Sequence, residues 1–311
     1  MQPLDLATLP TPVEPAPRLA RMLGLEPDDL WVKHDDLLGL GGGGNKVRKL
    51  RHTCAEALDR GARVLVTTGA AQSNHARLTA AAGARLGLEV ELVLAGNDAA
   101  PTTGNLMLDR MLGARLIWAG DVPHEALEQV AADRVADLED SGTPAYQVPY
   151  GGSSVVGARG YVEAGLELLE QVPGVRHVVV ALGSGGTAAG LVAALGTERV
   201  LAVDTGATAD PRERTARLID GLGGDPSGLR IREDMVGAGY STLPEPVAEA
   251  LLLAARTEGI VLDPVYTGRA LAGLIAAVRD GDVRTGERTV FLHTGGLPGV
   301  FGSVPLAERL G

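Results

Sequence analysis

Short apolar segments alternate with helical patterns along most of the chain. Strands are expected at residues 30–33, 64–66, 90–94, 115–118, 177–182, 200–203 and 289–293. The helices expected between or after them cover residues 74–86, 105–112, 125–138, 155–169, 188–195, 210–219, 244–257 and 268–278. Strands that alternate with helices are typical of parallel βαβ units, whose sheets are covered on both faces. We therefore predict an α/β fold with open, mostly parallel sheets.

A glycine run lies between the first strand and a helical pattern. Gly41, Gly42, Gly43 and Gly44 precede Asn45-Lys46-Val47-Arg48-Lys49-Leu50, in which Asn45 is a good helix N-cap. Lysine occurs elsewhere only at Lys33, so chemistry that needs a lysine amine has three candidates. The glycines are interpreted as slack that lets a lysine move.

Composition excludes several classes of protein. The 311 residues are 45% apolar and 22% charged, which is ordinary for a folded enzyme, and the net charge of −11 disfavours nucleic acid and anionic membranes as partners. The single cysteine, Cys54, gives neither an intramolecular disulfide nor a metal cluster. Residues 1–9 lack the features of a signal peptide, and no apolar run is long enough for a membrane span. We expect a cytoplasmic protein without a bound metal.

Two polar motifs follow predicted strands at the point where a helix begins. In Gly183-Ser184-Gly185-Gly186-Thr187, free backbone N–H groups at a helix start favour a phosphate, although such a turn can also carry no ligand. Gln72-Ser73-Asn74-His75 has the same setting, and there Ser73 or Asn74 could simply cap the helix. Open α/β folds bind ligands at such strand ends, which predicts a cleft shared with Lys46.

A lysine beside a phosphate loop, without metal-ligand spacing or a nucleotide motif, indicates pyridoxal phosphate held as a Schiff base. This cofactor needs an amine for its aldehyde, N–H donors for its phosphate and polar contacts for its ring. The alternative is that Lys46 is a solvated helix residue, as most lysines are.

Six motifs in register resemble the D-cysteine desulfhydrase and 1-aminocyclopropane-1-carboxylate deaminase family. Besides the three motifs above, these are Gly239-Tyr240, Asp263-Pro264-Val265-Tyr266-Thr267-Gly268 and His293-Thr294-Gly295-Gly296. The similarity runs from about residue 9 to about residue 302. It implies the tryptophan-synthase-β-like fold of pyridoxal phosphate enzymes, called fold type II, with two twisted sheets, and it implies a homodimer. Residues 1–50 with 160–311 would form the larger, cofactor-binding domain and residues 51–159 the smaller one, with the active site between them.

The resemblance also implies roles for individual residues. Lys46 would carry the cofactor and move the α proton. The cofactor phosphate would be held by Ser184, Gly185, Gly186 and Thr187, its ring oxygen by Asn74, and its ring nitrogen would lie near Thr294. Around the substrate, Ser73 and His75 would sit at the carboxylate and the proton-transfer face, Tyr240 and Tyr266 would line the substrate side of the ring, and Thr267 would contribute to specificity.

Two positions distinguish the branches of the family. Cyclopropane deaminases carry a glutamate where this chain has Thr267 and a leucine where it has Thr294. A neutral hydroxyl at the ring nitrogen favours β-elimination over the fullest carbanion stabilisation. The expected reaction is therefore α,β-elimination from a small β-substituted amino acid, chiefly D-cysteine, giving pyruvate, ammonia and sulfide.

Several alternatives remain open. His34 stands in place of an arginine, and Ser154-Val155-Val156 in place of an asparagine-containing turn, so the leaving group and the enantiomer stay undecided. The substrate could be cysteate, chloroalanine or aminocyclopropane carboxylate. A racemase, a cofactor-binding protein without turnover and a nucleotide-binding oxidoreductase are the further readings.

Overall fold

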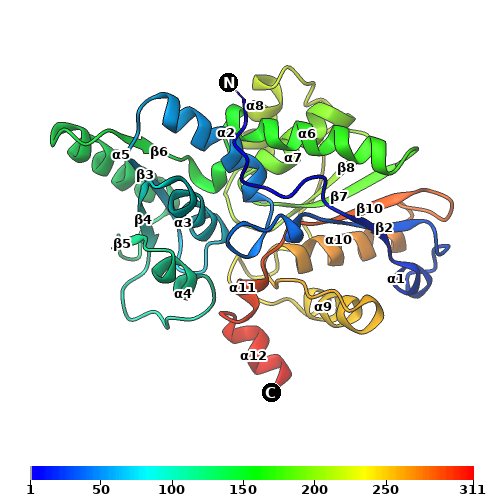
Figure 1. The fold of residues 1–311 in the computed structure, drawn as a ribbon. Helices are drawn as coiled ribbons and strands as arrows, with labels where there is room; N and C mark the ends of the chain where they lie inside the picture. Colours follow the sequence, from blue (N-terminus) through cyan, green and yellow to red (C-terminus); the bar gives the residue numbers. More distant parts are fainter. Residues whose placement is uncertain (1) are drawn as a thin grey trace.

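The computed structural model describes residues 2–311, apart from the side chains of His124 and Glu125. Its described residues form two sheets that lie side by side (Figure 1). The larger sheet has the strand order β1-β2-β10-β7-β8-β9, with bounds Val13–Pro15, Leu30–His34, Thr289–His293, His177–Leu182, Val200–Asp204 and Arg230–Arg232. The smaller has the order β5-β4-β3-β6, with bounds Arg115–Trp118, Glu89–Ala95, Val64–Ala70 and Ala145–Gln147. Among the strands of the described chain, only the β1–β2 pair is antiparallel, which confirms the predicted fold class.

Alternate side chains of the larger sheet enter two different cores. Val179, Val203 and Phe291 pack against α1, α9 and α10, whose bounds are Pro17–Met22, Glu245–Glu258 and Thr267–Arg279. Val180 and Leu292 face the opposite side, against α6, α7 and α8, whose bounds are Val155–Gln171, Gly186–Leu195 and Pro211–Gly221. Because side chains alternate along a strand, helices on both faces bury the apolar positions of the central strands β10, β7 and β8.

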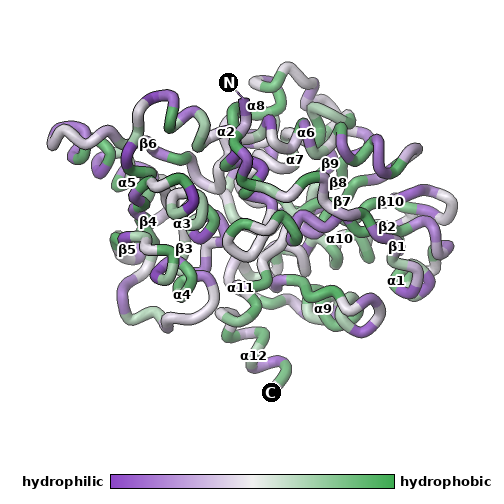
Figure 2. The backbone as a smooth tube through the Cα atoms, in the orientation of Figure 1, coloured by the Kyte–Doolittle hydropathy of each residue, from purple (hydrophilic) through white to green (hydrophobic). Residues whose placement is uncertain are grey.

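The smaller sheet is covered in the same way. Leu65 and Leu92 pack against α2, α3 and α4, with bounds Lys46–Asp59, Asn74–Leu86 and Gly104–Met111. Val66 and Val93 pack against α5, with bounds His124–Asp140. Figure 2 shows the apolar segments gathered in the strands and the inner helix faces. The chain ends with two short helices, α11 and α12, with bounds Leu297–Val300 and Val304–Leu310.

Helix α2 connects the two sheets. It begins directly after the glycine run, lies centrally in Figure 1, and puts Val47, Leu50 and Cys54 into the core of the smaller sheet. The domain boundary predicted after residue 50 falls inside α2, and the one predicted after residue 159 falls inside α6. Both helices therefore belong to the junction between the sheets.

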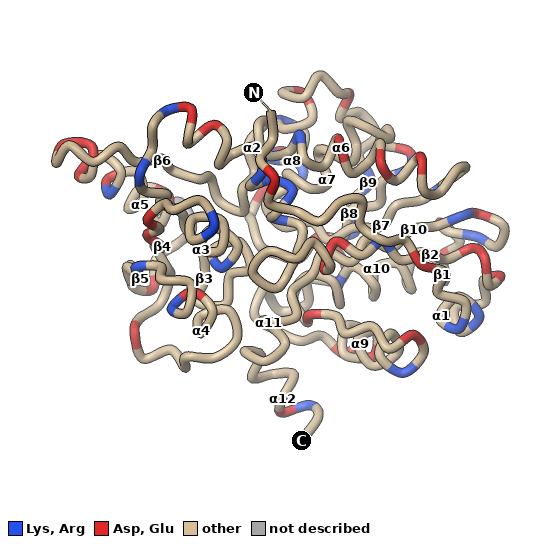
Figure 3. Tube along the Cα trace, viewed as in Figure 1, with Lys and Arg blue, Asp and Glu red and all other residues tan. Residues whose placement is uncertain are grey.

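The surface is charged but mixed. Figure 3 shows basic and acidic residues interspersed along the outer helices. Within residues 2–311, no helix is both long and apolar enough to cross a membrane.

Candidate active site

Strands of both sheets end at adjoining cavities. The first cavity is lined by residues that include Lys46, Lys49, Asn74, Gly185, Thr187 and Thr294. The second includes Ser73, His75, Tyr150, Ala207 and Tyr240. Lys46, Asn74, Ser184 and Tyr266 line both. The structure thus brings the predicted lysine, phosphate loop and tyrosines together, as expected for loops that follow parallel strands.

Lys46 is the first residue of α2, and its amine is enclosed. Its Nζ donates a hydrogen bond to Asn45 Oδ1 at 3.1 Å and lies 5.8 Å from the centre of the Tyr266 ring. Burial lowers the pKa of Lys46 to about 8, although the nearby charge of Asp263 opposes this shift. Asn45 occupies the N-cap position of α2 as predicted, but its side chain makes no cap hydrogen bond, and its Nδ2 donates instead to Thr187 Oγ1 at 3.0 Å. A partner distant in sequence therefore replaces the local cap.

The glycine run is bent and tightly held. All four glycines have positive φ, and a Cβ on Gly43 would lie 1.8 Å from the carbonyl oxygen of Asp36. Arg77 Nη1 donates to the carbonyl oxygens of Gly41 at 2.6 Å and Gly43 at 2.9 Å. These contacts favour a fixed turn that aims Lys46 over the interpretation of the run as slack.

The loop of residues 183–187, predicted to bind phosphate, contacts two residues for which the sequence predicts no role. Helix α7 begins at Gly186, whose N–H donates to Ser153 Oγ at 3.1 Å. Lys49 Nζ donates to the same oxygen at 3.0 Å and to Gly151 O at 3.1 Å. Ser153 also shares a hydrogen bond of 2.7 Å with Ser184 Oγ. The sequence offers Lys49 only as an alternative to Lys46, although its position one helical turn further along α2 indicates that both lysines share their surroundings.

The electrostatics of the first cavity fit an anionic cofactor. Burial lowers the pKa of Lys49 well below its usual value, and the nearby charges of Lys46 and Arg214 lower it further. Arg214 Nε donates to Ser184 O at 3.2 Å. Among the described residues that line the two cavities, none is acidic. A phosphate at the start of α7 would compensate the positive charges of Lys46, Lys49 and Arg214, since no acidic residue lines the described part of either cavity.

The second cavity carries the groups expected around a substrate. Ser73 caps α3, because its Oγ accepts the Ala76 N–H at 3.1 Å. His75 is buried, with Nε2 2.9 Å from Thr67 Oγ1, and burial followed by the charge of Lys46 lowers its pKa well below the usual value. Tyr240 and Tyr266 share a hydroxyl hydrogen bond of 2.6 Å, and burial raises the pKa of both phenols.

Thr267 is not brought to the cavities. Its Oγ1 donates to Asp263 Oδ1 at 2.7 Å and accepts the Asp263 N–H at 2.8 Å, so the side chain is buried in the start of α10. Asp263 itself accepts the N–H groups of Val265, Tyr266 and Thr267 at 3.0, 2.9 and 2.8 Å. Thr267 therefore orients a helix start rather than the lining of the cleft. Gly186 contributes through its N–H and is also absent from the described lining.

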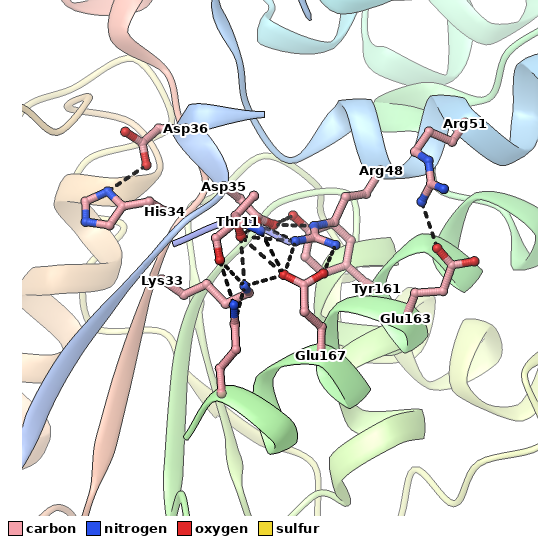
Figure 4. Close-up of polar contacts among 11 residues, drawn as sticks. Thr11, Lys33, His34, Asp35, Asp36, Arg48, Arg51, Tyr161, Glu163 and Glu167 are labelled. Carbon is pink, nitrogen blue, oxygen red and sulfur yellow. Dashed lines mark hydrogen bonds and ion pairs between the residues drawn. The ribbon is translucent and has the colours of Figure 1, made fainter. Parts of the chain in front are cut away.

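A buried ionic network holds α2 against β2 and α6 (Figure 4). Arg48 donates from Nε and Nη2 to Asp35, both at 3.0 Å, and from Nη1 and Nη2 to Glu167, both at 3.0 Å. Lys33 Nζ lies 2.6 Å from Glu167, and Tyr161 donates to Asp35. Burial alone would raise the pKa of Glu167, but hydrogen bonds from Arg48 and Lys33 lower it to about 2. The network joins β2, α2 and α6.

Comparison with known proteins decides the family. The model described as "Pyridoxal-phosphate dependent enzyme" matches residues 4–295. The chain belongs to this family. It is 37% identical to the D-cysteine desulfhydrase of Salmonella typhi over 321 aligned residues, which cover 97% of this chain and 96% of that protein. It is 40% identical to a Pyrococcus abyssi protein provisionally named a 1-aminocyclopropane-1-carboxylate deaminase, covering 94% of this chain and 90% of that protein.

Solved structures support the same conclusion. The crystal structure of an ACC deaminase homologue superposes with a TM-score of 0.91 at 34% identity, covering 100% of this chain and 95% of the other. Maize serine racemase, at 20% identity and a TM-score of 0.66, shares the fold alone. The expected family, fold type II and pyridoxal phosphate are confirmed, and the chain is a pyridoxal phosphate-dependent enzyme.

Proposed function

We propose that the enzyme catalyses α,β-elimination from a small β-substituted amino acid, with D-cysteine as the favoured substrate. The observation that carries this proposal is the position of Lys46. Its amine, with a pKa of about 8, lines the first cavity, where a phosphate would bind, and lies near the hydrogen-bonded, partly buried pair of Tyr240 and Tyr266. A lysine that is substantially neutral near pH 8 can both capture an aldehyde and accept a proton.

Other residues of the chain would hold the cofactor and orient the substrate. Pyridoxal phosphate supplies the electron sink that makes the substrate α carbon acidic. Ser184, Gly185, Gly186 and Thr187 would hold its phosphate, with Lys49 as the compensating charge, while Asn74 and Thr294 would meet its ring oxygen and ring nitrogen. Ser73 and His75 would orient the substrate carboxylate. Lys46 would take up the α proton.

The tyrosine pair offers a proton for the leaving group. The Tyr240 and Tyr266 hydroxyls are 2.6 Å apart, so a proton given by one can be replaced from the other. In the overall balance, the α proton and the β thiolate leave the substrate and the resulting enamine reacts with water. D-cysteine and water thus yield pyruvate, ammonia and hydrogen sulfide.

Elimination is favoured over ring opening because, among the described residues, no free carboxylate faces the second cavity. Position 267 holds a threonine, whose hydroxyl is engaged by Asp263. The Asp263 carboxylate in turn accepts backbone N–H groups at the start of α10. Neither side chain offers a free carboxylate to the second cavity. Thr294 supplies a neutral group on the ring-nitrogen side.

Aminocyclopropane carboxylate deamination is the second candidate. Its support is the 40% identity to the Pyrococcus abyssi protein and the structural match to the ACC deaminase homologue. A racemase reaction, cysteate and chloroalanine are further outcomes of the same test.

A substrate panel separates these candidates. The holoenzyme is assayed for 2-oxo acid and ammonia release from D-cysteine, L-cysteine, cysteate, chloro-D-alanine and aminocyclopropane carboxylate. We expect pyruvate and sulfide from D-cysteine, and no turnover by the Lys46→Arg control, which keeps the charge but cannot hold the cofactor productively. Activity on the cyclopropane alone would overturn the proposal.

We further propose a cytoplasmic homodimer built from the two domains defined by residues 1–50 with 160–311 and 51–159. Fractionation of the source cells tests the location. Light scattering of the purified protein tests the assembly, with about twice the 32.0 kDa chain mass expected. A mass equal to that of one chain would contradict the homodimer.

A further inference from the structure

Asn105 lies behind the residue proposed to hold the cofactor ring oxygen. It is the second residue of α4, is fully buried, and lines neither of the two cavities. Its Nδ2 donates to Asn74 Oδ1 at 2.9 Å and to Gln72 O at 3.0 Å. Its Oδ1 accepts from Arg77 Nε at 3.1 Å. All hydrogen-bonding groups of this amide side chain point at named partners.

The hydrogen-bond partners of the Asn105 side chain are compatible with one orientation of its amide group. A guanidinium can only donate and a backbone carbonyl can only accept. The oxygen of Asn105 must therefore face Arg77, and its NH₂ group must face Gln72 O and Asn74. Asn74 consequently presents Oδ1 to Asn105, and its own NH₂ group points the other way. Among the described residues, Asn74 Nδ2 has no protein partner, while Asn74 lines both cavities.

We infer that Asn105 is a positioning residue that locks the Asn74 amide with its NH₂ group toward the cofactor ring oxygen. This inference rests on the proposed role of Asn74. An unlocked Asn74 can rotate its amide and present oxygen to oxygen, which removes a hydrogen bond and adds repulsion. Asn105 itself touches neither cofactor nor substrate.

The hydrogen bonds that orient Asn105 also extend to the glycine run, residues 41–44. The same Arg77 that orients Asn105 donates from Nη1 to Gly41 O and Gly43 O. One guanidinium thus sets both the turn that aims Lys46 and the amide that faces the cofactor ring. Two contacts from different segments are fixed relative to each other by a single buried group.

The lock has a spectroscopic consequence. The proton between the ring oxygen and the Lys46 nitrogen is lost at high pH, which leaves a negative charge on the ring oxygen. A hydrogen-bond donor at this oxygen stabilises that charge and therefore lowers the pKa of the proton. Loss of the donor raises the pH midpoint of the visible cofactor band by about one unit. The titratable groups whose charges act on Lys46 or neighbour it are Asp263, Arg77, Lys49, His75 and Tyr266, and all are retained in the variants below.

The test is a double-mutant cycle on pyridoxal phosphate-loaded protein. Asn74→Ala, Asn105→Ala and the double variant are titrated by absorbance, and the dissociation constant for pyridoxal phosphate is measured by fluorescence. We expect each single variant to raise the midpoint and to weaken cofactor binding about tenfold. The double variant should match Asn74→Ala, because Asn105 acts through Asn74.

Two controls keep the outcome interpretable. Gln72→Ala removes Oε1, the acceptor of the Asn105 backbone N–H, but keeps the hydrogen bonds from Arg77 to Asn105 and from Asn105 to Asn74. The pH midpoint of this variant should therefore equal that of the wild type. Asn105→Asp keeps the shape and the Arg77 contact but cannot donate when ionised, so it should shift the midpoint even if Asn105→Ala fails to fold. An unshifted midpoint in Asn105→Asp, or additive shifts in the double variant, overturns the inference. Absence of any visible band in the wild type would instead contradict the proposed function.

Discussion

Replacement of Arg48 by methionine should strongly destabilise the protein. The Arg48→Met change removes four hydrogen bonds to Asp35 and Glu167 and leaves two largely buried carboxylates with one cation, Lys33. Breaking a buried ion pair by removing one partner typically costs about 3–5 kcal/mol, because the remaining charge is uncompensated. Urea unfolding of the apoprotein, followed by circular dichroism, measures this free energy of unfolding.

A matched control lies three residues along the same helix. Arg51 pairs with Glu163 at 2.8 Å, but the Glu163 side chain is 42% exposed, so Arg51→Met should cost about 1 kcal/mol or less. Adding Glu167→Gln to Arg48→Met rebalances Lys33 with Asp35 and should recover at least about 1 kcal/mol. Equal losses for the Arg48 and Arg51 variants would refute the reasoning that the network anchors α2.

Three further predictions follow from the site and its supports. Since Lys46 has a pKa of about 8 rather than 10.5, the rate at which apoprotein captures pyridoxal phosphate should rise about tenfold per pH unit below pH 8 and then level off; a rise that continues to pH 10 contradicts the low pKa. The pKa of Glu167 is lowered from 4.5 to about 2 in the folded protein, so its contribution to stability is present above pH 4.5 and is lost as the pH falls toward 2. In Glu167→Gln, the free energy of unfolding should therefore depend less steeply on pH over that window. An unchanged slope would contradict this prediction. Gly43→Ala should destabilise far more than the about 1–2 kcal/mol expected for Gly61→Ala, because both glycines have φ +73° but only Gly43 would place a Cβ against Asp36 O; equal melting temperatures would contradict the tight turn.

The alternation of apolar strands and helices was sufficient to predict the two sheets. Long buried strands such as β7 and β4 carry a strong local signal because helices cover both of their faces. The strands β1, β6 and β9 were not predicted. Each has three residues and is only partly buried, so neither length nor periodicity distinguishes it from a loop.

The gathering of these residues at one place was easier to predict than their partners. Motif positions after strand ends indicated Lys46, Asn74 and the loop from Ser184 to Thr187, and the structure places them at the first cavity, while their roles stay predictions. The distant contacts were not accessible in this way. Asn45 binds Thr187, which lies 142 residues further along the chain. Thr267 bonds to Asp263, only four residues before it, a local contact that the motif comparison did not indicate.

Support residues were missed for the same physical reason. Ser153, Asn105 and Arg77 join segments that are 28 to 104 residues apart in sequence, and their types are common on any polar surface. Only the folded chain shows that their polar groups converge at the cofactor site. Lys49 could have been ranked higher, because a lysine one helical turn from Lys46 must share its surroundings.

The most direct test of the account is chemical trapping of the cofactor. Holoprotein is reduced with borohydride, digested, and analysed by peptide mass spectrometry, with Lys46→Ala treated in parallel. The account predicts one pyridoxyl group per chain, located on Lys46, and none in the variant. A label on Lys49 or Lys33, or no label on saturated wild-type protein, would contradict it.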